Sequence, residues 1–68
     1  GGLAFYKHIA PAYFGALKPG GRLILEIGWR QADAVCALCL SAGYEDVSVR
    51  SDLSSNPRCV LARRPIAF

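Results

Sequence analysis

The pattern of apolar and polar positions divides the 68-residue chain into a helix, a strand, a second helix and two closing strands. Between residues 3 and 17, apolar side chains recur every three or four residues, which is the spacing of one helical face. The face consists of Leu3, Tyr6, Ile9, Ala10, Tyr13, Phe14 and Leu17. Pro11 predicts a kink or two short helices here, because proline lacks a backbone donor and clashes with the preceding turn. Residues 19–21, Pro-Gly-Gly, end the helix.

Residues 23–27 form an almost unbroken apolar run, interrupted only by Glu26. A strand of this kind is suited to cover on both faces, as in a parallel sheet. Only two helices are predicted here, so we expect much of one face and one lateral edge of the strand to stay uncovered. A second helix follows over about residues 31–42, and Gly43 suits the left-handed position that ends a helix. The inner face of this helix is expected to hold Ala32, Val35, Cys36, Cys39 and Ala42, widened by Leu38 and Leu40.

Two further strands are predicted at residues 47–50, which alternate as an edge strand does, and at residues 59–62, which are apolar. The turn-forming residues 52–57 between them predict a hairpin, with an ion pair between Asp52 and Arg58 across its loop. The order of elements indicates an α/β fold, and we interpret residues 1–68 as a single partial domain.

Composition restricts the function classes. Eight basic and five acidic side chains give a net charge of +3, and the weak cluster of Arg58, Arg63 and Arg64 has no interleaved aromatic residues. A solvated surface is therefore favoured over a nucleic-acid site. No apolar run approaches the roughly 20 residues that span a bilayer, and no leader pattern supports secretion. Hydrophobic residues make up 53% of the chain, which is high for 68 residues and indicates apolar faces that are covered by protein outside this chain.

The three cysteines favour buried thiols over disulfides or a metal site. An odd number argues against a closed disulfide framework. Cys36 and Cys39 have Cys-x-x-Cys spacing but lie inside the second helix, whereas redox pairs usually lie at a helix N-terminus. A zinc ion would need two more ligands, and Cys59 and His8 are an unconvincing supply.

Candidate chemistry is concentrated after the first strand, because open α/β sheets bind ligands beyond the carboxyl ends of their strands. Glu26 interrupts the apolar run, and a buried carboxylate needs a partner or a function. It is a candidate acceptor of hydrogen bonds from a substrate amide; the alternative is a carboxylate satisfied by backbone N–H groups or an arginine. Trp29 lines a substrate cleft or covers the sheet end. Gln31 is expected either to hold a loop or to cap the start of the second helix, and the cap is favoured. His8 is expected at the surface.

Several motifs together resemble the C-terminal end of the HemK/PrmC family. The weakly specific part is Lys-Pro-Gly-Gly at residues 18–21, which is common to many class I methyltransferases. More specific are Leu-Glu-Ile-Gly-Trp-x-Gln at residues 25–31 and the spacing from Asp52-Leu53 to Arg58-x-Val60. Leu-Ala-Phe-Tyr at residues 3–6 and Ala-Gly-Tyr-x-Asp-Val at residues 42–47 add to the likeness. A mild departure is Ala-Asp-Ala-Val at residues 32–35, where family members often have Gly-Glu-Ala-Val.

The resemblance implies the C-terminal portion of a Rossmann-like class I methyltransferase sheet, with the last strand inserted antiparallel between the strands at residues 23–27 and 47–49. It implies a cytoplasmic enzyme that transfers a methyl group directly from S-adenosylmethionine to a glutamine side-chain amide of peptide chain release factors. The family's glycine-rich cofactor loop, its acidic ribose-binding residue and its Asn-Pro-Pro-Tyr motif do not occur in this sequence. No catalytic, cofactor-binding or metal-binding residue is therefore assigned. Glu26 and Trp29 are the candidate substrate-binding residues.

Two other functions stay open from the sequence. One is a different class I methyltransferase, with another protein or a nucleic acid as acceptor. The other is a non-enzymatic interaction fragment. For the methyltransferase of release factors, neither a membrane nor a nucleic acid is expected as a partner.

Overall fold

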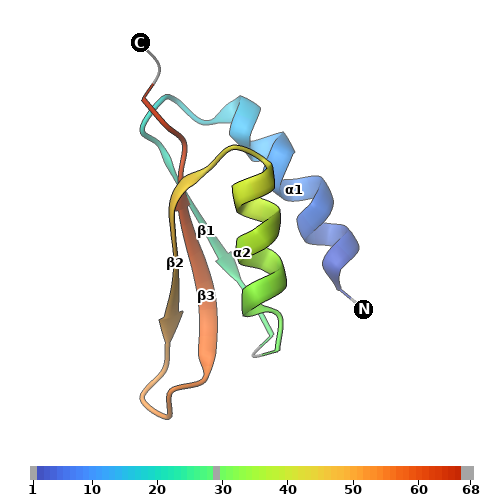
Figure 1. Ribbon diagram of the computed structural model, residues 1–68, viewed down its shortest axis with the longest axis vertical. Coiled ribbons are helices and arrows are strands. Elements are labelled where there is room, and N and C mark those ends of the chain that lie inside the picture. Colours follow the sequence, from blue (N-terminus) through green and yellow to red (C-terminus); the bar gives the residue numbers. More distant parts are fainter. Residues whose placement is uncertain (1, 29, 67–68) are drawn as a thin grey trace.

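Two helices cover one face of a three-stranded sheet (Figure 1). The structure is a computed structural model that describes residues 2–28 and 30–66. In chain order the elements are α1 (Leu3–Ala16), β1 (Arg22–Glu26), α2 (Ala32–Ser41), β2 (Glu45–Ser51) and β3 (Pro57–Arg63). The predicted order, helix–strand–helix followed by a hairpin, is confirmed.

The last strand lies in the middle of the sheet. The order is β1-β3-β2, and β3 pairs antiparallel with both neighbours. Val60 of β3 is opposite Leu25 of β1 and Val49 of β2. The two outer strands, β1 and β2, therefore run parallel to each other, and their carboxyl ends lie at the same end of the sheet. This is the insertion that the family resemblance implied, and periodicity alone did not predict it.

Strand β1 is buried on one face only. Leu23 and Leu25 are buried in the core, whereas Ile24 between them is 63% exposed. The alternation arises because both helices pack on the same side of the sheet (Figure 1). Among the described residues, the lateral edge of β1 that faces away from β3 pairs with no strand. The expected uncovered face and free edge are confirmed.

Helix α1 continues through Pro11, so the alternative of two short helices is wrong. One proline removes a single backbone hydrogen bond, and the packing of the helix on the core compensates for it. The predicted inner face is confirmed at Ala10, which is buried, and wrong at Tyr13, whose side chain is 47% exposed. Within the described residues, no helix is both long and apolar enough to span a membrane.

Helix α2 matches its predicted bounds to within one residue at each end. Val35 and Cys39 are fully buried, while Leu40, expected to widen the inner face, lies exposed. Gly43 ends the helix at φ +104°, as predicted, and a side chain there would meet the ring of Phe14. The core comprises Ala10, Leu23, Leu25, Ile27, Val35, Cys39, Tyr44, Val60 and Ala62.

The uncovered sheet face leads to a prediction about the isolated chain. Ile24 and its cross-strand neighbour Leu61 lie on that face, and the free edge of β1 offers backbone groups for pairing. We expect the isolated chain to self-associate or to bind a hydrophobic dye, and we expect Ile24→Lys to reduce both effects. Dye fluorescence and sedimentation measure them. A monomer that melts sharply and ignores the dye would contradict the prediction.

Candidate functional site

The carboxyl end of β1 lies beside the β2–β3 hairpin loop. Figure 1 shows the turn after β1 and the hairpin loop at the same end of the molecule. The residue after β1 contacts the start of β3 directly, because the Ile27 N–H donates to the Arg58 carbonyl over 2.9 Å. This end of the sheet is the place where open α/β sheets bind ligands. Of the two candidate residues, Glu26 is the last residue of β1, and Trp29 follows three residues later in the sequence.

Residues 26–28, called here the strand-end segment, are held by three separate elements. The hydroxyl of Tyr6 on α1 donates to the Glu26 carbonyl over 2.6 Å. The backbone of Arg58 at the start of β3 accepts from Ile27. The Gly28 N–H donates to Oε1 of Gln31, at the start of α2, over 2.8 Å. The segment is therefore fixed by contacts from α1, β3 and α2 at once.

Gln31 holds the turn with its side chain. The residue occupies the N-cap position of α2, and its carbonyl accepts from Val35, but its side chain makes no capping hydrogen bond. Its Oε1 instead bonds Gly28, and the Gln31 N–H donates back to the Gly28 carbonyl over 2.9 Å. The favoured prediction, a side-chain cap, is wrong, and the loop-holding alternative is confirmed. A glutamine is long enough to reach back three residues, which a short capping side chain is not.

Glu26 is exposed, so its predicted burial is wrong. It shares the uncovered face with Ile24, because alternate residues of a strand point to the same side. Its cross-strand partner on β3 is Cys59. The carboxylate therefore needs no buried partner, and its candidacy rests on position alone. Trp29, the other candidate, lies outside the described residues.

Tyr6 is the residue at this end that sequence reasoning missed. Its apolar spacing placed it on the inner face of α1, and it does pack against the core. The signal that distinguishes it from a leucine is the hydroxyl, which finds a partner when the ring is packed. That partner, the Glu26 carbonyl, is twenty residues away in sequence and was not predictable from spacing.

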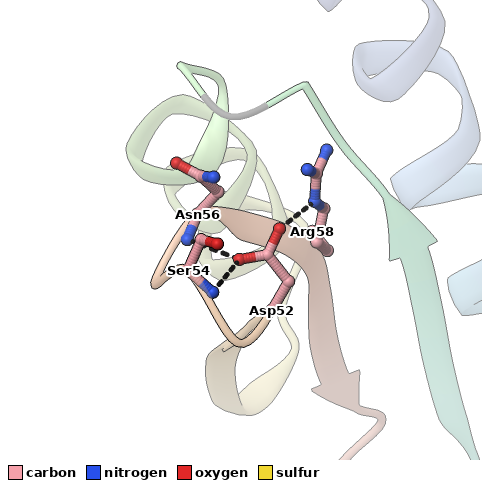
Figure 2. Close-up of polar contacts among 4 residues, drawn as sticks. All are labelled: Asp52, Ser54, Asn56 and Arg58. Carbon is pink, nitrogen blue, oxygen red and sulfur yellow. Dashed lines mark hydrogen bonds and ion pairs between the residues drawn. The ribbon is translucent and has the colours of Figure 1, made fainter.

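Asp52 organises the hairpin loop. Its carboxylate accepts from the backbone N–H groups of Ser54 and Asn56 over 2.9 and 3.0 Å, and from Arg58 Nε over 2.8 Å (Figure 2). These bonds, led by the one from Asn56, lower the pKa of Asp52 below its ordinary value. The predicted ion pair with Arg58 is confirmed. These contacts therefore hold the hairpin loop in one conformation next to the start of β3.

Cys36 and Cys39 on α2 and His8 on α1 lie outside the strand-end segment. All three thiols are free, and burial raises the pKa of both Cys36 and Cys39. A raised pKa disfavours the thiolate, which is the reactive form. His8 is exposed on α1, as predicted. Across residues 2–28 and 30–66, no group of three potential metal-ligating side chains gathers.

The arginines of the weak basic cluster bind groups within the chain. Arg63 pairs with Glu45 and Asp46 at the start of β2. Arg64 donates to the Phe14 carbonyl over 2.8 Å and to the Leu17 carbonyl, and its guanidinium lies 5.0 Å from the Phe14 ring centroid. Arg58 pairs with Asp52 in the same way. All three arginines of the cluster therefore stabilise contacts within the chain.

The helix–strand–helix–hairpin order and the central antiparallel strand define the α/β fold expected for the C-terminal portion of a class I methyltransferase. Sequence similarity then shows which named proteins this segment resembles. The chain is 47% identical over 60 residues to a release factor glutamine methyltransferase of Caulobacter vibrioides, which is 88% of this chain and 21% of that protein. It is 48% identical over 66 residues to a protein of the same name from Cereibacter sphaeroides, which is 97% of this chain and 24% of that protein. The chain is thus related in sequence to the release factor glutamine methyltransferases over this segment, and the predicted resemblance is confirmed.

A third relative has a broader name. A bifunctional methyltransferase of Rickettsia felis is 43% identical over 60 residues, which is 88% of this chain and 11% of that protein. No protein-family model matches the chain, and no solved structure matches it. The chain spans about a quarter or less of the length of these curated relatives.

Proposed function

We propose that this chain is the C-terminal part of a methyltransferase that transfers a methyl group from S-adenosylmethionine to the side-chain amide of a glutamine in peptide chain release factors. The observation that carries the proposal is the sequence identity of 47–48% to proteins named for that activity, over 88–97% of the chain. The arrangement of β1, β3 and β2 supports it, because it matches the order implied by the family resemblance. Release factors act in translation, so we place the enzyme in the cytoplasm.

We assign no cofactor-binding site to the described residues. Their hollow of about 230 Å³ lies on the open sheet face and is lined by Arg22, Asp46, Ser48, Arg50, Leu61, Ala62 and Arg63. Arg63 in this lining is paired with Glu45 and Asp46, so ion pairs of the chain itself occupy part of the hollow. The family's glycine-rich loop is also missing from this sequence. We therefore assign cofactor binding to residues of the complete enzyme outside this chain.

This chain's proposed contribution is to the acceptor side of the reaction. The strand-end segment lies where substrates of open α/β sheets bind, and its backbone is fixed on three sides. We propose that the Glu26 carboxylate accepts a hydrogen bond from the substrate amide N–H and that Trp29 lines the acceptor cleft. A fixed amide close to the methyl donor needs no covalent intermediate, because orientation lowers the barrier.

The name of the Rickettsia relative favours a second candidate, a methyltransferase with a different or additional acceptor. Within the described residues, we assign no side chain that would select one nitrogen acceptor over another. Both candidates predict methyl transfer to nitrogen, and the acceptor distinguishes them.

The test is methyl transfer by the complete enzyme of which this chain is part. Incubated with S-adenosylmethionine and a release factor, it should add one methyl group to a glutamine side chain, located by fragment mass spectrometry. A release factor with asparagine in place of that glutamine is the control and should stay unmodified. Transfer only to nucleic acid or to another protein would support the second candidate and contradict the first.

A further inference from the structure

We infer that Tyr6 and Gln31 are positioning residues, which fix the strand-end segment in the orientation that methyl transfer requires. The inference rests on the proposed function and adds two residues to the proposed site. Neither residue is proposed to touch the substrate. Both act through the backbone of residues that lie closer to it.

Tyr6 acts on Glu26. Its hydroxyl donates to the Glu26 carbonyl over 2.6 Å and comes from a different element, α1. This carbonyl belongs to the last residue of β1, an edge strand that pairs with β3 on one side and, among the described residues, with no strand on the other. Fixing the carbonyl restricts the orientation of the peptide plane between Glu26 and Ile27, and with it the backbone position from which the Glu26 side chain extends.

Gln31 acts on Gly28. Oε1 accepts from the Gly28 N–H over 2.8 Å, and the Gln31 N–H donates to the Gly28 carbonyl over 2.9 Å, so the two residues are joined by a reciprocal pair. A Cβ on Gly28 would lie 3.2 Å from Oε1, closer than an ordinary contact, so the side chain fits closely over the glycine. The Tyr6 hydroxyl is 3.5 Å from the same Oε1, which brings the two positioning side chains together.

These contacts serve geometry more than stability. The bonds at Glu26 and Gly28 are exposed, and a single exposed hydrogen bond contributes little to folding. A displacement of about 1 Å at a reacting centre, by contrast, can lower a rate by about a hundredfold. A structural counterpart exists in Tyr44, whose hydroxyl donates to the Ala10 carbonyl over 2.7 Å in the buried core. Tyr44 directly precedes β2 and Gly28 follows β1, and because these two strands run parallel, the residues lie at opposite ends of the sheet.

The test removes one hydrogen-bonding side-chain group at a time in the complete enzyme. Tyr6→Phe and Gln31→Met should each lower kcat by about fivefold or more, with the KM for S-adenosylmethionine unchanged. Gln31→Glu retains an oxygen acceptor for Gly28 and should recover most of the kcat lost in Gln31→Met. Tyr44→Phe removes a bond of similar length, and it should lower the melting temperature while leaving kcat per folded molecule unchanged.

A second readout does not depend on activity. Backbone amide exchange, followed by mass spectrometry, should be faster across residues 26–31 in Tyr6→Phe and Gln31→Met but unchanged there in Tyr44→Phe. Unchanged kcat and unchanged exchange in the first two variants would overturn the inference, as would an equal loss of kcat in Tyr44→Phe. Failure of the proposed function is a separate outcome, seen as no methyl transfer to release factors by the unsubstituted enzyme.

Discussion

Titration of S-adenosylmethionine into the 68-residue chain should give no binding heat, and the chain alone should transfer no methyl group. The physical reason is that a nucleotide-like cofactor needs a glycine-rich loop and an acidic ribose partner, and neither occurs in this sequence.

The control for this prediction is the complete enzyme, which should bind the cofactor under the same conditions. Isothermal titration calorimetry compares the two directly. Stoichiometric, micromolar binding to the isolated chain would show that these residues hold the cofactor by themselves, and it would remove the reason for assigning cofactor binding to the rest of the enzyme.

Glu26→Gln in the complete enzyme should lower methyl transfer more than it lowers stability. If the carboxylate accepts a hydrogen bond from the acceptor amide, glutamine keeps the volume and removes the charge. A charge-assisted hydrogen bond contributes about 1.5–3 kcal/mol, a change on the order of tenfold to a hundredfold in rate. The exposed position of Glu26 in this structure predicts only a small stability effect, because surface substitutions without buried partners usually change stability by about 0.5 kcal/mol or less.

Turnover per folded molecule and the melting temperature, measured on the same purified variant, separate the two roles. Asp33→Asn is a matched control, since Asp33 is an exposed acid in the first turn of α2 rather than part of the strand-end segment. A structural role for Glu26 would lower the melting temperature and leave turnover intact. Unchanged turnover, whatever the stability, would exclude Glu26 from the site.

The elements were predictable because local chemistry determines them. The apolar spacing of α2 and the positive φ available to Gly43 set its length, and the turn formers around Asp52 set the hairpin. The central place of β3 was not predictable from periodicity, because a short apolar strand can have the same sequence pattern in the middle of a sheet as at its edge. That feature came from the family resemblance.

The site was only partly predictable. The alternation of burial along β1 depends on how many layers cover the sheet, which five apolar-rich residues do not encode, so Glu26 was expected to be buried and is exposed. Gln31 was recognised, but a glutamine at an N-cap position suits either a cap or a reach backward, and only the fold decides between them. Tyr6 was missed because its partner, the Glu26 carbonyl, belongs to another element.

The central claim is that the carboxyl end of β1 faces the methyl acceptor, and hydroxyl-radical footprinting of the complete enzyme tests it most directly. Trp29 is the single tryptophan of this chain, and its oxidation should fall when a release factor is added at a saturating concentration. Tyr13 and Phe5, both exposed on α1, provide the comparison and should be oxidised equally with and without the release factor. Unchanged oxidation of Trp29 at saturation would contradict the account, because the acceptor would then bind away from this end of the sheet.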